Sequence, residues 1–359
     1  MIKKTFISLC TASALLLGAS CTPQEQPGGA VSVILSSGQP ETRGAAEVAD
    51  GSEIYMNNGD PDLILLLFNS EGTLVAKYPD SGSELMDSPT PSGSDLTVRI
   101  TKTIGGDTLP GGEYTVYAIA NTAGLWALTD GDETNISAGE LSSSSITTQT
   151  QAEALYFSTL YPPTLGNGRL PLTAKTSLTV SEHGNGSAQL ELKRCVAQVV
   201  VKLVNNYTKQ LSLSNLSVTL RDLNASTGYL FPHNPDIPAG IVYADLVKEV
   251  STVTLPDNTV AANEVYEFSS LAFPGAAPQG TYACDISFGV SQVGESTLTP
   301  TRNFSFTGLP VHNNKGQDIT NLTRNQRLTI TVTINQGQML SFSFEVGEWT
   351  AKTETVTFD

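Results

Sequence analysis

Strict alternation of apolar and polar residues over several stretches limits the fold of this chain more than any other feature of its sequence. Leucine, isoleucine and valine occupy every second position of 328–334, with threonines between them. The same two-residue period runs through 96–100 and 340–346. Successive side chains of a β-strand point to opposite faces, so each stretch predicts a strand with one buried face. Because Ser, Thr, Asn, Gly and Pro fill the connections, the sequence predicts an all-β fold made of sandwiches.

Two stretches depart from simple alternation in an informative way. Residues 63–68 are apolar at every position, which predicts a central strand buried on both faces. Within 211–220 the apolar phase switches from odd to even positions near Ser214 and Asn215. One extra residue in a strand has this effect, so the switch predicts a β-bulge.

The N-terminal residues have the order of a bacterial lipoprotein signal. Two lysines precede an apolar stretch, residues 6–17, and three small residues separate that stretch from Cys21. A spanning helix needs roughly 20 apolar residues, so this shorter stretch predicts a removed signal and not a membrane helix. We expect Cys21 to carry a diglyceride and an acyl chain such as palmitate. Ordinary secretory cleavage nearby is the alternative.

The rest of the chain is long enough for two domains of ordinary size. We expect a signal peptide in 1–20, a lipidated tether with a first strand in 21–43, an N-terminal β-sandwich in 44–188 and a C-terminal β-sandwich in 189–359. The boundary is placed at the end of the turn-rich segment 181–187, because a new series of strand-like residues begins there.

Charge and motifs exclude several classes of function. The formal net charge is −16, and loss of the two signal lysines makes it −16 − 2 = −18, which argues against nucleic acid as a partner. The three histidines have no metal-binding spacing, and the acidic segment 130–135 lacks the glycine that a calcium loop needs at its sixth position. We therefore expect no metal, no cofactor and no enzymatic activity.

Cys195 and Cys284 are the two cysteines expected in the folded part. Both lie on the apolar phase of a predicted strand. An oxidising compartment would permit a disulfide between them, whereas cysteine is also readily buried as a free thiol. The sequence leaves both arrangements open.

Five segments in order resemble the fimbrillin family of Bacteroidales, the lipoprotein-derived subunits of the type V pilus. They are 41–44, 65–74, 110–121, 194–203 and 325–349. The resemblance implies two transthyretin-like β-sandwich domains, transport to the outer membrane by the lipid, and cleavage after an arginine near the N-terminus. The matching arginine is Arg43, which precedes Gly44.

Cleavage at this position would remove a strand as well as the lipid. Arg43 lies in a polar connection where a protease can bind an extended backbone. The segment released with the lipid contains Val31, Val33 and Leu35, which share one face of a predicted strand. Its loss would leave a groove with unpaired backbone groups on both sides.

The resemblance implies that a C-terminal strand of another subunit fills this groove. The donor candidates are Phe342, Phe344, Val356 and Phe358, which lie on the apolar phase of the last residues. The alternative is that the segment around Val356 and Phe358 is an edge strand of its own domain.

We therefore expect a structural pilus (fimbrium) subunit that supports cell adhesion. Its expected partners are other copies of itself or sister pilus subunits in a head-to-tail filament. We expect a lipid-anchored precursor at the outer membrane and a mature form on the cell surface. The alternatives are a pilus anchor, a tip subunit, or a glycan-binding surface lipoprotein with Trp126 as the aromatic platform.

Overall fold

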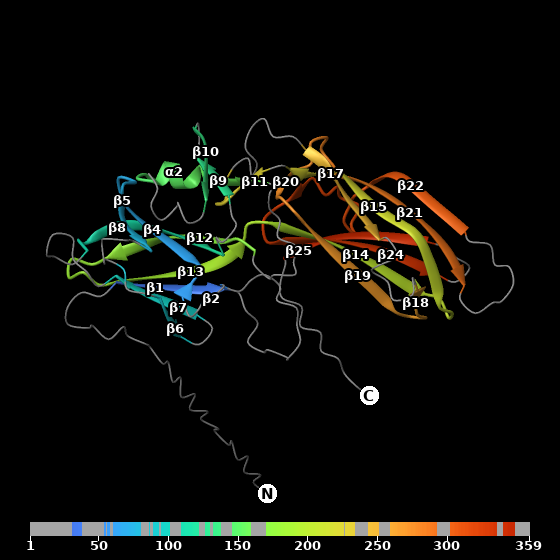
Figure 1. Cartoon of the computed structure of the whole chain (residues 1–359), viewed down its shortest axis with the longest axis horizontal. Helices are drawn as coiled ribbons and strands as arrows, with labels where there is room; N and C mark the ends of the chain where they lie inside the picture. Colours follow the sequence, from blue (N-terminus) through green and yellow to red (C-terminus); the bar gives the residue numbers. More distant parts are fainter. Residues whose placement is uncertain are drawn as a thin grey trace, which may run out of the picture.

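The computed structural model describes residues 31–37, 54, 56–57, 60–79, 86, 89–92, 95–100, 109–121, 126–129, 132–137, 146–158, 170–225, 227–233, 243–250, 259–292, 302–335 and 340–348. Every regular element in these ranges is a strand except the short helix α2 (Gln149–Glu153), so the predicted all-β class is confirmed. Two domains lie side by side along the long axis of the molecule (Figure 1). Over the same ranges, no helix is long and apolar enough to cross a membrane.

The N-terminal domain is built on eight strands in the order β5-β4-β8-β12-β13-β1-β7-β6. β12 and β13 share only the ladder pairs Leu172↔Arg194 and Thr173↔Lys193, and the sheet divides there into two four-stranded layers. The inner faces of both layers form one core, and we call this unit the N-terminal sandwich. Its strands are β1 (Val31–Ser37), β4 (Leu63–Asn69), β5 (Leu74–Tyr78), β6 (Thr90–Ser92), β7 (Asp95–Ile100), β8 (Gly112–Ala120), β12 (Leu172–Val180) and β13 (Gly186–Arg194).

β4 is buried on both faces, as its continuous apolar run predicted. Leu65 and its odd-numbered neighbours face the core of the N-terminal sandwich, and Leu66 and its even-numbered neighbours face a second core. We call the second one the inter-domain core, because both domains contribute to it. Its members are Ile64, Leu66, Phe68, Tyr117, Ile119, Ile146, Ala152, Leu155, Leu170, Cys195, Val196, Ala225, Leu230, Phe231, Leu271 and Phe273.

A small sheet beside the inter-domain core also combines the two domains. Its order is β10-β9-β11-β16, and β16 follows the long strand β15 (Leu211–Ala225) of the C-terminal domain. The strands are β9 (Trp126–Thr129), β10 (Asp132–Ser137), β11 (Tyr156–Ser158) and β16 (Thr227–Tyr229). The pairing of β11 with β16 therefore ties the two domains together through backbone hydrogen bonds.

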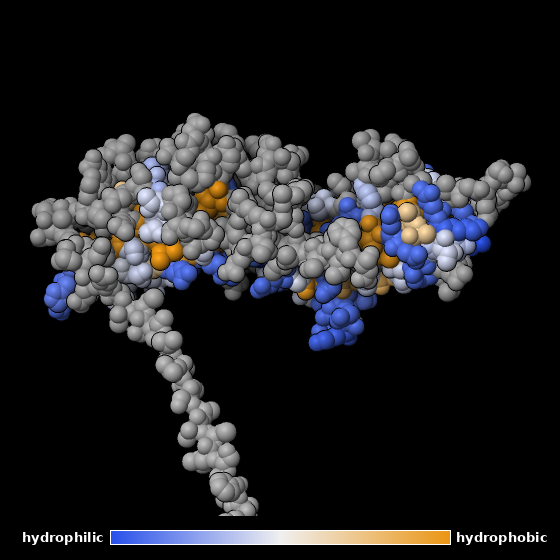
Figure 2. Space-filling model, turned by 90° about the horizontal axis from the view of Figure 1, so that it is seen from below, coloured by the Kyte–Doolittle hydropathy of each residue, from blue (hydrophilic) through white to orange (hydrophobic). Residues whose placement is uncertain are grey.

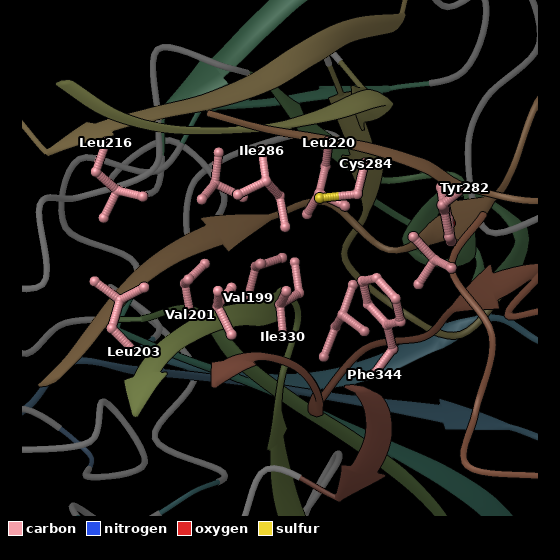
Figure 3. Close-up of a cluster of buried hydrophobic side chains, with 14 of the residues drawn as sticks. Val199, Val201, Leu203, Leu216, Leu220, Tyr282, Cys284, Ile286, Ile330 and Phe344 are labelled. Atoms are coloured by element: carbon pink, nitrogen blue, oxygen red, sulfur yellow. The ribbon is translucent and has the colours of Figure 1, made fainter. Parts of the chain in front are cut away.

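The C-terminal domain is a second sandwich, with the sheets β19-β14-β24-β25 and β17-β15-β21-β22. Figure 3 shows Val199, Val201 and Ile330 of the first sheet facing Leu220 and Ile286 of the second. Between the inward positions of β24 lie partly exposed threonines, whereas β14 also buries Val200 on its other face. On the face in Figure 2 the apolar areas of this domain are separated by hydrophilic residues. The strands are β14 (Ala197–Asn206), β15 (Leu211–Ala225), β17 (Tyr243–Val250), β19 (Val265–Ala272), β21 (Ala283–Gln292), β22 (Arg302–Pro310), β24 (Gln326–Asn335) and β25 (Leu340–Glu348).

Two local predictions for this domain are confirmed. The apolar positions of β24, Leu328 to Ile334, are buried and the threonines between them are partly exposed. The register between β15 and β21 shifts between Ser214 and Ser217, where the apolar phase switches and the bulge was predicted.

The domain boundary differs from the predicted position at residue 188. β13 continues the N-terminal sheet to Arg194, and β14 begins the C-terminal sheet at Ala197. Residues 181–185 form the turn between β12 and β13, held by a hydrogen bond from Ser181 N to Asn185 O of 2.8 Å. A tight turn between two strands of one domain has the same Gly, Asn and Ser composition as a linker, which explains the displacement.

Candidate functional site

β1 occupies an interior position of the N-terminal sandwich, between β13 and β7. It runs parallel to β13 over seven residue pairs, from Val31↔Gly186 to Ser37↔Leu192. It runs antiparallel to β7 over five pairs, from Val31↔Ile100 to Leu35↔Leu96. We call this position the β1 slot. Without β1, both neighbouring strands would have unpaired backbone groups.

The inward face of β1 consists of Val31, Val33 and Leu35, which are 1%, 0% and 0% exposed. Each such side chain contributes roughly 1.5 to 3 kcal/mol when fully buried, so the three together contribute about 5 to 9 kcal/mol. The outward face carries partly exposed serines, of which Ser36 Oγ donates a hydrogen bond of 3.3 Å to Leu190 O. β1 is therefore attached mainly by its two ladders and three apolar side chains.

The ladder partner of Val31 on β13 is a glycine, Gly186, which also lies close to β12. The partners of the inward residues along β13 are Gly186, Ala188 and Leu190, which increase in size along the strand. A Cβ atom on Gly186 would lie 2.8 Å from Thr179 O and 3.2 Å from Leu178 Cδ1, closer than such contacts allow. The close approach of β12 and β13 therefore requires glycine at this position.

The first half of the predicted donor segment belongs to the C-terminal sandwich itself. β25 lies at the edge of its sheet and pairs with β24 over nine residue pairs. Phe344 is 7% exposed in the core, and the half-buried Phe342 meets Phe306 of β22 edge-on, with ring centroids 4.9 Å apart. Phe342 and Phe344 are thus engaged within their own domain.

Several predicted positions lie outside the described residues. These are Cys21, Arg43, Gly44, Val356 and Phe358. Trp126 lies in β9, but its side chain is not among those described.

Cys195 and Cys284 are both free and buried. Cys195 belongs to the inter-domain core and Cys284 to the core of the C-terminal sandwich, so the disulfide that the sequence left open is not formed. Burial raises the pKa of the Cys284 thiol to about 12 and raises the pKa of Cys195 above its ordinary value. Both groups are therefore protonated thiols at neutral pH.

The junction between the domains contains contacts that the sequence pattern did not indicate. Arg324, in the turn before β24, donates hydrogen bonds of 2.7 Å to Leu230 O, 2.9 Å to Tyr229 O and 3.1 Å to Thr173 Oγ1 of β12. Arg194 at the end of β13 donates a hydrogen bond of 2.8 Å to Asn325 Oδ1. A single arginine among turn residues has no periodic pattern, so no sequence signal distinguishes Arg324 from a solvated side chain.

Glu153 is an ionisable group with several partners, at the place where α2 packs against the N-terminal sandwich. Glu153 of α2 accepts hydrogen bonds of 2.6 Å from Tyr117 Oη, 3.1 Å from Lys175 Nζ and 3.3 Å from Gln149 Nε2. Burial alone would raise the pKa of Glu153, but these hydrogen bonds and the charge of Lys175 outweigh it and lower the pKa. The cluster holds α2 against β8 and β12 and has the character of a structural contact.

The geometry alone does not identify a family for this chain, whereas known proteins with a similar sequence or fold do. The family profile described as "Fimbrillin-A associated anchor proteins Mfa1 and Mfa2" matches residues 62–355. Among solved structures, a candidate cell adhesion protein from Parabacteroides distasonis ATCC 8503 has a TM-score of 0.52 at 11% identity, covering 91% of this chain and 99% of its own. This likeness agrees with the fold described above.

Two fimbrial structures are also similar. The tip fimbrial protein Mfa3 from Porphyromonas gingivalis has a TM-score of 0.49 at 14% identity and covers 89% of this chain and 99% of its own. A fimbrilin from Porphyromonas gingivalis W83 has a TM-score of 0.47 at 12% identity and covers 92% and 99%. No curated protein is significantly similar. Because the family profile spans most of the sequence, the resemblance to fimbrillins is confirmed, and the chain belongs to the fimbrial family of fimbrillin-A associated anchor proteins Mfa1 and Mfa2.

Proposed function

We propose that this chain is a structural subunit of a fimbrium, made as a lipoprotein precursor and joined to its neighbours by exchange of a strand. In this proposal Cys21 is lipidated, and the lipid carries the precursor to the outer membrane. A protease then cuts between Arg43 and Gly44, residues 21–43 leave, and a strand of a neighbouring subunit takes the place of β1. The assembled fimbrium supports adhesion at the cell surface.

The interior position of β1 is the observation that carries the proposal. Loss of a strand at a sheet edge would leave the remaining ladder continuous. Loss of β1 would instead separate β7 and β6 from β13 and uncover the apolar floor of the slot. A groove with open backbone groups on both sides and an apolar floor favours binding of an added strand.

The connection that follows β1 also suits release of the strand as a unit. Arg43 lies 43 − 37 = 6 residues beyond the end of β1 at Ser37. β1 has no tight turn to either neighbour, since β13 and β7 come much later in the chain. A cut after Arg43 would therefore leave β1 intact but held only by non-covalent contacts.

The proposed donor is the C-terminal segment, in which Phe342, Phe344, Val356 and Phe358 are the apolar candidates. Donation by Phe342 and Phe344 requires β25 to leave β24, whereas Val356 and Phe358 lie beyond β25. The slot and the donor are different surfaces of the chain, so each contact is head-to-tail and can extend a filament.

Limited proteolysis of the lipid-free chain, starting at Thr22, tests the proposal. The intact mass is measured before and after treatment with an arginine-specific protease, with Arg43→Ala as the matched control. The cut chain is then incubated alone and with sister fimbrial subunits, and SDS-resistant complexes are resolved by electrophoresis. We expect the cut after Arg43 and the SDS-resistant complexes only in the wild type and not in Arg43→Ala. A cut chain that stays monomeric under both conditions would contradict strand exchange.

A second candidate function is that of a pilus anchor that keeps its lipid and β1. The description of the matching family as anchor proteins favours it. An anchor is distinguished from a processed subunit by its N-terminus on the cell surface. Mature protein that still begins at a lipidated Cys21 would support the anchor, and mature protein beginning at Gly44 would support the processed subunit.

A further inference from the structure

We infer that the β1 slot is refilled by a strand from a different fimbrial subunit and not by a second copy of this chain. This inference rests on the proposed function, because it concerns the strand that replaces β1 in the slot. It follows from a mismatch between the slot and the apolar segments that this chain carries near its C-terminus.

The slot requires three apolar side chains at consecutive inward positions, where Val31, Val33 and Leu35 now lie almost fully buried. Their partners on the two neighbouring strands are all apolar or glycine: Gly186, Ala188, Leu190, Leu96, Val98 and Ile100. A charged side chain in place of Val33 would therefore be buried beside Ala188 and Val98 without a counter-charge.

The segment after β25 does not meet this requirement on either face. One face carries Lys352, Glu354, Val356 and Phe358, so any three consecutive positions include Glu354. Burial of that carboxylate among apolar partners is strongly unfavourable. The other face carries threonines at 353, 355 and 357, which would bury three hydroxyl groups with little apolar area.

β25 has the required alternation, but it already serves another core. It forms nine residue pairs with β24, and Phe344 lies in the core of the C-terminal sandwich with Leu340, Phe342 and Val346 packed against that core. Transfer of β25 to the slot would open one core in order to fill another, so the gain and the loss of buried apolar area offset each other.

The size of the β25 side chains adds a second obstacle. Any three consecutive inward residues of this strand include at least one phenylalanine. The slot holds two valines and a leucine, which are at most 1% exposed within the core of the N-terminal sandwich. Insertion of larger side chains into a close-packed core forces strain.

The slot therefore selects a strand with three alternating side chains of valine, isoleucine or leucine size and no inward charge. A sister subunit with such a segment is the matching partner. Within this proposal the chain accepts a foreign strand and alternates with, or terminates, a row of other subunits.

Peptide binding to the cut chain tests this selectivity. The lipid-free chain is cut after Arg43 and unfolded in denaturant, and labelled peptides with the sequences of residues 30–38, 339–348 and 349–359 are added separately in excess during refolding, so that they compete with the retained β1 segment for the slot. Native mass spectrometry gives the stoichiometry and fluorescence polarisation gives the affinity. We expect one β1 peptide per chain and at least about 100-fold weaker binding of the two C-terminal peptides.

Variants of the β1 peptide and of the protein serve as controls. Val33→Asp in the peptide should abolish binding, because this side chain points inward, whereas Ile34→Asp on the opposite face should bind. The uncut Arg43→Ala chain should bind none of the peptides.

The outcomes separate this inference from the proposed function. Binding of either C-terminal peptide within about tenfold of the β1 peptide, or SDS-resistant ladders of the purified cut chain alone, would overturn the inference and leave strand exchange standing. Failure of the β1 peptide to bind the cut chain would overturn both.

Discussion

The two sandwiches of this molecule place their terminal strands in opposite ways. The N-terminal sandwich has its first described strand, β1, inside a layer, with ladders of seven and five residue pairs on its two sides. The C-terminal sandwich has its last described strand, β25, at an edge, with one ladder of nine pairs. Loss of β25 would remove one edge strand and leave its sheet continuous, whereas loss of β1 would divide the layer that contains it.

This difference shows that alternation and length do not decide which strand can be exchanged. Both strands alternate, and β25 is the longer one. What distinguishes β1 is an interior position combined with the absence of a tight turn to either neighbour. When an interior strand leaves, open backbone ladders remain on both sides of the gap and favour binding of another strand. When an edge strand leaves, only one open ladder remains.

The largest effect is expected from a charge on the inward face of β1. Val33→Asp buries a carboxylate among apolar residues and should lower the free energy of unfolding by about 4 kcal/mol or more. Ile34→Asp on the partly exposed face should cost much less, and Phe342→Asp in β25 should lie between the two. Denaturant unfolding checks this order, and equal costs for the two β1 variants would contradict the buried, interior position of the strand.

A smaller effect is expected at the contact that joins the two sandwiches. Arg324→Met removes three hydrogen bonds and leaves the carbonyl groups of Tyr229 and Leu230 without this donor, so it should cost about 3 kcal/mol. Lys315→Met at an exposed turn should change stability by less than about 0.5 kcal/mol.

Calorimetry shows in addition whether the sandwiches unfold together. We expect one transition in the wild type, because of the inter-domain core, and a broader or divided transition in Arg324→Met. Unchanged stability in this variant would mean that the guanidinium contributes nothing net at the junction.

The effect of one added methyl group on stability can be compared between the two sandwiches with Gly186→Ala and Gly347→Ala. Gly186→Ala should cost about 2 kcal/mol, because the new Cβ would meet Thr179 O at 2.8 Å. Gly347→Ala in β25 should be almost neutral, because no atom lies within 4 Å of its Cβ position. Thermal unfolding of the two variants checks the difference, which would disappear if the β12–β13 turn could relax freely.

The smallest effect is expected from pH. Glu153 in the N-terminal domain and Asp285 in the C-terminal domain both have lowered pKa values, and Asp285 owes this to the Gly308 N–H and to Arg221, which outweigh desolvation. A lowered pKa contributes stability that is present above the ordinary value, 4.5 for Glu153 and 3.8 for Asp285, and is lost as pH falls through the folded-state value.

Replacement of each carboxylate tests this dependence in its own domain. Glu153→Gln should flatten the decline of stability below pH 4.5, and Asp285→Asn should do so below pH 3.8. Unfolding curves measured from pH 3 to pH 7 show the slopes. A steeper decline in either variant would be the opposite sign and would contradict the assigned hydrogen bonds.

The sequence predicted those features that depend on neighbouring residues. The alternation of β24, the two-sided burial of β4 and the bulge in β15 each follow from a pattern within about ten residues, because the period of a strand fixes which side chains share a face. The inward set Val31, Val33 and Leu35 was also identified in this way. The fimbrial family followed from segments spread over the chain.

Other features needed the tertiary structure. The predicted boundary at residue 188 divided β13, because a turn within a domain and a linker between domains have the same composition. The contacts of Arg324 and the separate cores of Cys195 and Cys284 likewise involve residues far apart in the chain.

The sequence by itself determined that the chain is all-β and, in the strands with clear alternation, which side chains face inward, because strand periodicity is a local property. Only the tertiary structure decided that β1 lies between β13 and β7, that Gly186 lets β13 approach β12 closely, and that β25 is occupied in its own sandwich. Strand order depends on which apolar faces and open ladders fit together across the whole chain, and no local pattern contains that information.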